Sequence, residues 1–205
     1  MNASAPASQM GDTNTRQRIE SAVLSVFSKH DYHHASLQMV AKEARVSLRT
    51  IYKYYGNKEQ LFLICIGTHL EQLSARVLDH LQAVRALKDR IHKIVWLTLD
   101  YFETYSEMAT IIFGSVQLNL WRNDHSFTQP EVMSVLMTAL KQGREEGVIT
   151  DEVKEIVVLD YILGIIGRLV TMWLVRGRSY SLTEQHEVLF EMLWRAIAKP
   201  EPVEA

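Results

Sequence analysis

The chain of 205 residues is 47% hydrophobic and 22% charged, an ordinary globular balance that excludes collagen-like, disordered and disulfide-scaffold classes. Cys65 is the only cysteine, so an intramolecular disulfide is impossible, which fits a cytoplasmic protein. The net charge of −2 conceals an asymmetry: residues 1–60 hold eight Lys and Arg against five Asp and Glu, whereas residues 61–205 hold fourteen against nineteen. A basic head on an acidic body can orient a molecule toward polyphosphate.

The hydrophobic pattern predicts an all-α fold. Apolar residues recur at helical spacing along most of the chain, and the Asn-Gly and Asp-Gly turns typical of β-hairpins are missing from the sequence. The chain begins with a small, polar stretch, so we expect a flexible tail over residues 1–14. About nine helices are predicted after it, at residues 19–27, 36–44, 47–55, 57–82, 87–105, 107–121, 130–146, 151–176 and 181–198.

Residues with the chemistry of helix caps mark several of these boundaries. Ser36, Ser47 and Asn57 each offer a side-chain oxygen to the free amides of a first helical turn. Gly56 follows the third helix, where glycine lets the backbone leave the helical path. Ser181, with a glutamate three residues later, has the pattern of a capping box, which predicts that the last helix begins there.

The second and third helices, joined by a tight turn at residues 44–46, have the lengths of a helix-turn-helix. In such a unit the second helix enters the major groove of DNA and the first crosses the backbone. The residues predicted to face inward are Val46, Leu48, Ile51 and Tyr55. The residues predicted on the outer surface are Arg49, Thr50, Tyr52, Lys53 and Tyr54.

This outer set has the chemistry of DNA contacts. Arg49 can fork to a guanine edge, and Thr50 can meet a base edge or a thymine methyl group. Lysine at position 53 and the tyrosine hydroxyls more often bind phosphates, and Lys58 adds a cation near the start of the next helix. The alternative is a solvated amphipathic helix, but exposed tyrosines such as Tyr52 favour a partner.

A specific motif lies at residues 41–61, which read AKEARVSLRTIYKYYGNKEQL. With the preceding helix, this stretch resembles the DNA-binding domain of the tetracycline-repressor-like (TetR/AcrR) family. The matching features are Val46-Ser47, Thr50, Tyr52 after Ile51, Tyr55, and Lys58-Glu59 before Leu61. The resemblance implies a homodimer on a palindromic operator in double-stranded DNA. It places Ser36, Ser47, Arg49, Thr50, Tyr52, Tyr54 and Lys58 at the family's DNA-contact positions.

Two positions depart from the family pattern. Asp31 stands where glycine is common after the first helix, and Arg45 where glycine is common in the turn. Aspartate tolerates a left-handed backbone, whereas arginine there costs on the order of 1 kcal/mol. Arg45 therefore either keeps a right-handed turn or points at a phosphate, and both alternatives stay open. With Lys53, it completes the candidate DNA contacts.

The resemblance implies two domains, a helix-turn-helix domain at residues 15–60 and an effector-binding and dimerisation domain at residues 61–205. The apolar segment at residues 156–175 is as long as a membrane span, yet Asp160 and Arg168 would each cost roughly 2.5–3.5 kcal/mol at a bilayer centre. We expect no membrane partner and interpret the segment as a dimer-interface helix, with a monomeric core helix as the alternative. The predicted dimer contacts are Gly164, Gly167, Leu189, Leu193 and Trp194.

Aromatic residues gather in the middle helices, where they form either plain core or the wall of a small-molecule pocket. The family resemblance favours a pocket for an apolar or aromatic effector. The candidate effector contacts are His92, Trp96, Phe102, Phe113, Gln117, Trp121 and Trp173.

Signals of catalysis or metal binding are weak in the sequence. His33 and His34 are adjacent and lack the i, i+4 spacing of a helical metal pair, and Cys65 lies in an apolar run typical of a core. We therefore predict no catalytic residue, no metal ligand and no cofactor. The resulting hypothesis is a cytoplasmic repressor released by a small effector. The alternative is a DNA-binding adaptor controlled by a protein partner, without a small-molecule pocket.

Overall fold

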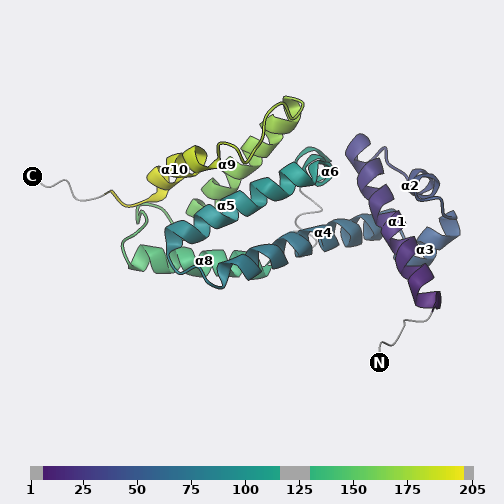
Figure 1. The fold of residues 1–205 in the computed structure, drawn as a ribbon, viewed down its shortest axis with the longest axis horizontal. Helices are drawn as coiled ribbons and strands as arrows, with labels where there is room; N and C mark the ends of the chain where they lie inside the picture. The colour runs from purple at the N-terminus through teal and green to yellow at the C-terminus, as the bar shows by residue number, and fades with distance from the viewer. Residues whose placement is uncertain (1–6, 116–129, 201–205) are drawn as a thin grey trace, which may run out of the picture.

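The structure, a computed structural model, describes residues 7–115 and 130–200 (Figure 1). Within these ranges it contains nine α-helices and one π-helical turn, which confirms the predicted all-α fold. The elements are α1 (Ala7–Lys29), α2 (Leu37–Ala44), α3 (Leu48–Tyr55), α4 (Lys58–Leu81), α5 (Leu87–Thr104), α6 (Ser106–Thr110), the π-helical turn η1 (Ile111–Ser115), α8 (Pro130–Glu145), α9 (Glu155–Val175) and α10 (His186–Ile197).

Helices α1, α2 and α3 form one end of the molecule, which we call the head (Figure 1). α1 packs on α2, and α3 packs between α2 and α4. Their apolar stripes enclose a core that includes the fully buried Val23, Val40 and Ile51. The rings of Phe27 on α1 and Phe62 on α4 lie 4.9 Å apart, so this core continues into the fourth helix.

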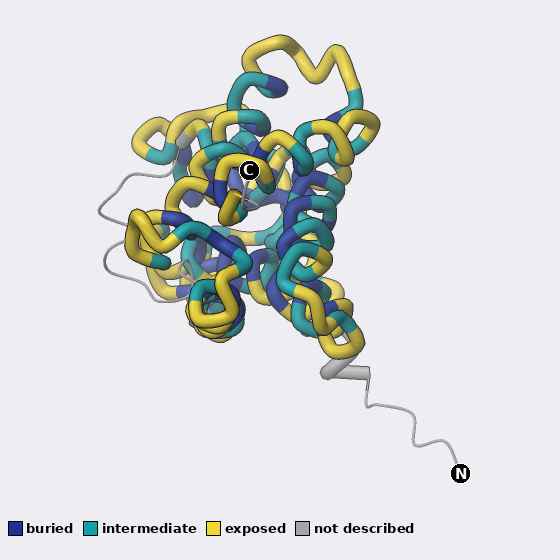
Figure 2. Tube along the Cα trace, turned by 90° about the vertical axis from the view of Figure 1, so that its left-hand side faces the viewer, coloured by how far each residue is buried: buried dark blue, intermediate teal, exposed yellow. Residues whose placement is uncertain are grey.

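The other helices form the body, with α5 at its centre in contact with α4, α6, α8, α9 and α10. Leu97 and Leu99 on α5 have no exposed surface, and Leu140 on α8 and Val170 on α9 are equally buried. Figure 2, seen from the end that carries the C-terminus, shows buried and exposed stretches alternating along these helices. This is the pattern of amphipathic helices around a shared core.

Helix α4 connects head and body, because it packs on α1 and α3 and also on α5 and α8 (Figure 1). Helix α6 and η1 touch α1 as well. The head therefore contacts the rest of the molecule through α4, α6 and η1.

The first helix is longer than the sequence indicates. It begins at Ala7, so residues 7–14, which were expected in a flexible tail, are helical. This segment lies against α3, where the carboxylate of Asp12 accepts a hydrogen bond from the Tyr54 hydroxyl. Such a tertiary contact is invisible in the polar composition on which the tail prediction depends.

The last helix begins at His186 rather than at Ser181. Ser181 Oγ does accept a hydrogen bond from the Glu184 amide, at 3.2 Å, so the capping contact forms. However, the carboxylate of Glu103 on α5 accepts hydrogen bonds from the Ser181 hydroxyl at 3.1 Å, and from the Thr183 amide and hydroxyl at 3.1 and 3.0 Å. These bonds hold residues 181–183 in a turn, so the helix begins only at His186.

The ninth helix also begins late, at Glu155 instead of residue 151. The backbone just before it is held elsewhere: Thr150 donates to the Ile197 carbonyl at 2.8 Å, and Arg144 donates to the Asp151 and Val153 carbonyls at 2.8 and 3.2 Å. The helix predicted at residues 107–121 is divided into α6 and η1, and residues 116–121 lie outside the described part of the chain.

Two described helices, α4 and α9, are long and apolar enough to cross a membrane by length and composition alone. Core and interface helices pass the same test. The outer surface of α9 carries the exposed charges of Asp160 and Arg168, as the sequence indicates.

Candidate DNA-binding site

The two helices of the predicted helix-turn-helix are capped as expected. Ser36 Oγ accepts a hydrogen bond from the Met39 amide at 3.3 Å, and Ser47 Oγ accepts one from the Thr50 amide at 3.0 Å. Both caps satisfy amides that have no partner inside the helix. The cap oxygens fix where α2 and α3 begin, and therefore which residues of α3 face outward.

The inward face of α3 is confirmed. Ile51 and Tyr55 are buried, while Val46 and Leu48 are half-buried against the same core. Burial raises the pKa of the Tyr55 hydroxyl well above its ordinary value. α3 is therefore fixed on the head along one side, and its opposite side is available for contact.

The turn between the helices has a left-handed residue. Arg45 has φ 54° and ψ 45°, so it occupies the conformation that glycine adopts most easily. The right-handed alternative for Arg45 is therefore wrong. Asp31, the other departure from the family pattern, is not among the left-handed residues of the described part of the chain.

A residue that sequence reasoning missed supports this turn. Arg18 on α1 donates from Nε and Nη2 to the Ala44 carbonyl at 3.1 and 2.8 Å, and from Nη2 to the Arg45 carbonyl at 2.7 Å. These carbonyls belong to the last turn of α2, where oxygens have no partner inside the helix. The only signal in the sequence is a basic residue on the first helix.

The outer face of α3 brings five candidate residues together. Ser47, Arg49, Thr50, Tyr52 and Lys53 line one shallow depression on the surface. The Ser47 and Thr50 hydroxyls lie 2.8 Å apart and hold one another in place. Tyr52 is 52% exposed, which is unusual for so large an apolar side chain. This surface therefore offers hydroxyls, two cations and an unpaired aromatic ring to a partner.

Tyr54 does not belong to this surface, so its predicted outward position is wrong. It is half-buried and packs toward α1, where its hydroxyl donates to Asp12. The cations of Arg16 and Lys53 lie 5.3 and 5.0 Å from the centre of its ring. The ring fixes the start of α1 on α3, and Arg16 brings a further cation to this edge of the head.

Lys58 lies one turn beyond α3, at the start of α4. Its Nζ is 4.5 Å from the centre of the Tyr32 ring and donates to the His33 carbonyl at 3.4 Å. Partial burial lowers its pKa from the ordinary value. The preceding Asn57 caps α4 by accepting a hydrogen bond from the Gln60 amide at 2.8 Å. The ammonium group therefore lies beside the positive end of a helix dipole, held by a ring and a carbonyl.

The predicted effector residues fall into two separate groups. Phe102 on α5 is buried and its ring lies 5.0 Å from that of Phe113 on η1, at an interplanar angle of 73°. A side chain at Gly167 on α9 would meet the Phe113 ring at 3.2 Å, so glycine allows this close approach. Trp173, also on α9, is buried and donates to the Tyr180 carbonyl at 2.7 Å. Gln117 and Trp121 lie outside the described residues.

His92 and Trp96, also on α5, contact the start of α10 instead. His92 Nε2 lies 3.1 Å from the Glu187 carboxylate of α10, and its ring is 4.5 Å from that of Phe190. The Trp96 ring lies 6.4 Å from that of His186, and Lys93 lies 4.7 Å from its centre. These two residues therefore contact α10, whereas Phe102 contacts η1, because one helix presents different residues to different neighbours. The effector role of His92 and Trp96 stays a prediction.

The predicted dimer residues are also divided. Gly164 is exposed, but Leu193 is buried within its own chain and Trp194 is half-buried, with its ring 6.2 Å from that of Phe190. Gly167 faces Phe113 of the same chain. Leu189 is half-buried. The apolar residues that α9 and α10 do expose are Ile156, Val157, Tyr161, Leu163, Val175, Val188 and Met192.

Comparison with known proteins places the whole molecule. The family model described as bacterial regulatory proteins, tetR family, matches residues 19–65, and the model of the YsiA-like protein C-terminal region matches residues 66–196. The chain is 29% identical over 140 residues to the HTH-type transcriptional repressor SCO4008 of Streptomyces coelicolor, which covers 68% of this chain and 69% of that protein.

Two solved structures share the fold. The fatty acid degradation regulator FadR from Bacillus halodurans matches with a TM-score of 0.77 and 19% identity, over 94% of this chain and 97% of that one. The transcriptional regulator FadR from Bacillus subtilis, in complex with stearoyl-CoA, matches with a TM-score of 0.76 and 20% identity, over 86% and 96%. The matched families contain transcription regulators rather than enzymes. The chain belongs to the tetR family of bacterial regulatory proteins and is a DNA-binding transcription regulator.

Proposed function

We propose that this regulator is a cytoplasmic repressor that binds a palindromic operator as a homodimer and is released by a small apolar or aromatic effector. The observation that supports it best is the outer face of α3, where Arg49, Thr50, Tyr52 and Lys53 lie on one exposed surface. The opposite side of the helix is anchored by Ile51 and Tyr55. A helix held in this way can enter a major groove without losing its support.

The roles of the contacts follow from their chemistry. The Arg49 guanidinium suits the paired acceptors of guanine, and Thr50 suits a base edge or a thymine methyl group. Lys53, Lys58 and the Tyr52 hydroxyl suit phosphates, which position the protein without reading sequence. Ser36 and Ser47 contribute mainly as caps. Arg45, exposed beside the turn, is assigned to a phosphate.

The homodimer is supported by apolar surface on α9 and α10. Val157 and Tyr161 on α9 are 49% and 44% exposed, and Val188 and Met192 on α10 are 65% and 62% exposed. These residues recur at helical spacing, with Gly164 on the same face of α9 as Val157 and Tyr161. Exposed apolar residues on these two helices form surface that a second copy would cover. Two recognition helices about one DNA turn apart would then read two half-sites.

The effector site is proposed near Phe102 and Phe113, with Trp173 on the facing helix. A π-helical turn carries Phe113, and such turns are frequent at functional sites. The B. subtilis FadR structure contains stearoyl-CoA, an apolar chain on a polar carrier, so long-chain acyl thioesters belong in the first panel of compounds. By linkage, an effector that prefers a body conformation with misplaced heads weakens DNA binding by the same factor.

The test is a binding-site selection with purified full-length protein and random duplex DNA. We expect a palindromic consensus bound with Kd of about 10⁻⁸–10⁻¹¹ M and a steep dependence on salt. Arg49→Ala and Tyr52→Ala should degrade the consensus, whereas Lys141→Ala, which removes an exposed cation of the body, should not. No enriched sequence at low salt would overturn the assignment of operator contacts to α3.

The effector is tested separately, by thermal shift and by operator release with acyl thioesters and aromatic compounds. A compound that raises Tm and releases DNA supports the proposal, and Phe113→Ala should weaken both effects. If DNA binding is intact and no apolar compound releases it, the protein-controlled adaptor becomes the better description.

A further inference from the structure

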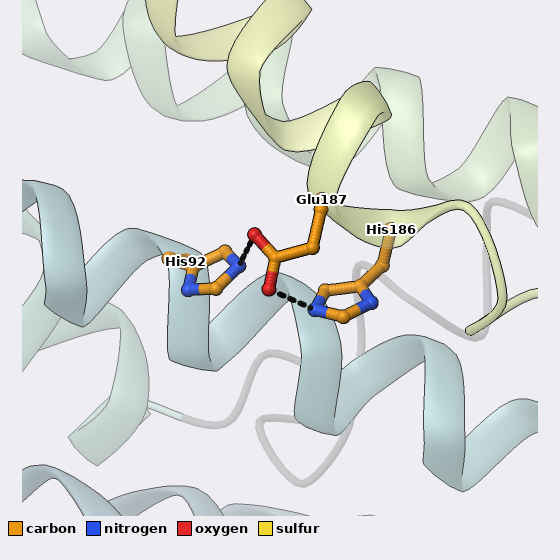
Figure 3. A group of neighbouring side chains, drawn as sticks. All are labelled: His92, His186 and Glu187. Carbon is orange, nitrogen blue, oxygen red and sulfur yellow. Dashed lines mark ion pairs between the residues drawn. The ribbon is translucent and has the colours of Figure 1, made fainter.

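Two imidazoles and one carboxylate meet where α10 begins against α5. Figure 3 shows Glu187 between His92 and His186, with one carboxylate oxygen toward each ring. The distances are 3.1 Å from Oε2 to His92 Nε2 and 3.1 Å from Oε1 to His186 Nε2. One potential ligand atom from each residue lies within 4.8 Å of the other two. Neither DNA binding nor the proposed effector site uses this cluster.

The hydrogen bonding of His186 determines what its Nε2 can do. Nδ1 lies 2.8 Å from the Thr183 carbonyl oxygen, which can only accept a hydrogen bond, so Nδ1 carries the proton. In the neutral ring Nε2 then presents a lone pair to the Glu187 carboxylate. Two lone pairs facing each other at 3.1 Å are favourable only with a cation between them. The backbone carbonyl behind the ring is also the usual second partner of a metal-bound histidine.

His92 supplies an independent observation. Its Nε2 has almost no solvent exposure and makes no well-directed hydrogen bond, although Glu187 Oε2 is 3.1 Å away. A buried ring nitrogen without a hydrogen bond is costly unless another partner satisfies it. A metal ion bonded along the nitrogen lone pair would satisfy it.

We propose that His92, His186 and Glu187 bind a divalent transition-metal cation of the zinc class. Two imidazole nitrogens and one carboxylate oxygen are a known ligand set for Zn²⁺, with bonds of about 2.0–2.2 Å and a fourth position for water. Tetrahedral ligands at those bond lengths lie about 3.4 Å apart. Each imidazole Nε2 lies 3.1 Å from a different oxygen of Glu187, and one ligand atom from each residue lies within 4.8 Å of the other two, so modest side-chain rotations would bring all three onto one ion. The side chain of Glu187 is 68% exposed, which leaves the fourth position open to solvent.

A neighbouring contact shows what a complete ion pair looks like on the same two helices. One turn away, Lys88 Nζ on α5 lies 2.7 Å from Glu191 on α10, and this pair holds the pKa of the Glu191 carboxyl below its usual range. There, cation and anion match one to one. In the histidine cluster, the Glu187 carboxylate faces two imidazole rings instead of an ammonium group, so the cluster offers a site for a positive ion.

The consequence of binding is mechanical. His92 lies in the second turn of α5, whereas His186 and Glu187 form the first turn of α10. An ion shared by them ties the start of α10 to the central helix of the body. Metal should therefore raise the thermal stability of the body, independently of any effector or DNA.

The experiment uses full-length protein without a polyhistidine tag, freed of metal by a chelator and titrated with Zn²⁺ alone by calorimetry. We expect one ion per chain, a rise in Tm, and, with Co²⁺ in its place, the visible absorption of tetrahedral coordination. His92→Ala and His186→Ala should each weaken affinity at least about tenfold. His80→Ala, an exposed histidine of α4, and Glu191→Gln should bind as the parent does.

The variants must first show parent-like helicity and Tm in the presence of chelator, so that a lost signal reports lost ligands. His186→Gln and His92→Gln serve as alternatives of closer volume. Zinc binding that survives both histidine substitutions would overturn the site. So would the absence of binding and of any Tm change at neutral pH, which would mean that a proton alone bridges the rings and the carboxylate.

Discussion

Arg18 on α1 holds the carbonyl oxygen of Ala44 at the end of α2 with two donors, at 3.1 and 2.8 Å. The same guanidinium reaches the next carbonyl at 2.7 Å, so one side chain caps the helix that leads into the recognition turn. The helix-turn-helix therefore depends on α1 for its turn geometry as well as for its core.

Replacing Arg18 by alanine should lower the free energy of unfolding by about 1–2 kcal/mol, because two carbonyl groups lose a charged donor. The loss should be strongest in α2, where amide hydrogen exchange would accelerate. Gln17→Ala, on the same exposed turn of α1, is the matched control. Equal effects of the two substitutions in urea unfolding would show that the cap contributes nothing.

Arg45 keeps a left-handed backbone at φ 54°, which costs an L-residue about 1–2 kcal/mol relative to glycine. Glycine has more conformational freedom in the unfolded chain, which offsets about 0.4–1 kcal/mol of this gain. Arg45→Gly should therefore stabilise the protein by about 0.5–1 kcal/mol. Arg45→Val should destabilise it. The urea midpoints of both variants test this order, and a lower midpoint for Arg45→Gly than for Arg45→Val would contradict it.

Arg49 and Lys53 line the same depression, but their substitution should affect DNA binding differently. Arg49→Ala should cost about 1–3 kcal/mol at the consensus operator and relax the preference at one base pair per half-site. Lys53→Ala should weaken all sequences alike and reduce the salt slope by about 1 per protomer. Titrations at several salt concentrations on consensus and scrambled duplexes separate the two. If Lys53→Ala relaxed the base preference and Arg49→Ala weakened all sequences alike, the two roles would have to be reversed.

His69 on α4 should make stability depend on pH. Burial lowers its pKa from the ordinary value of 6.5, and its buried Nδ1 makes no hydrogen bond in the described structure. Between the two pKa values the unfolded chain binds more protons, so the contribution of His69 is complete above the unfolded pKa and is lost as pH falls through the folded pKa.

We therefore expect Tm to fall between pH 7 and pH 5 less steeply in His69→Gln than in the parent, whereas His80→Gln, at an exposed position of α4, should follow the parent curve. The carboxyl groups whose pKa values are lowered, such as Asp151 beside Lys199, stay ionised between pH 7 and pH 5, so their stabilising contribution is constant over this range and is lost only at lower pH. Parallel curves for the parent and His69→Gln would rule out the role of His69.

The local features of the head could be predicted from the sequence, because caps and helical spacing are encoded within a few residues. Ser47 and Ile51 illustrate this, one by its cap and the other by its buried face. The position of Tyr54 could not, because it depends on a helix start at Ala7 that a polar stretch does not signal. In the body, the start of α10 depends on Glu103, which lies about 80 residues earlier in the chain.

Helix faces explain the remaining differences between the sequence predictions and the contacts in the structure. The six-residue step from Trp96 to Phe102 turns a helix through about 240°, so the two side chains serve different neighbours. Aromatic composition alone cannot separate a pocket wall from a helix junction. Leu193 and Met192 show the same limit, since adjacent apolar residues on α10 point to the core and to the surface.

The antiparallel bridge between Ile149 and Ala198 brings together the two ends of the segment that contains α9 and α10. Hydrogen bonds from Thr150 to the Ile197 carbonyl and from Lys199 to the Val148 carbonyl, at 2.8 and 3.0 Å, fasten both ends. The segment therefore begins and ends at neighbouring points of the structure, so it could be exchanged as one unit. A chimera in which the segment between Ile149 and Ala198 is replaced by that of a relative should dimerise with the relative. It should still bind the operator of the parent protein.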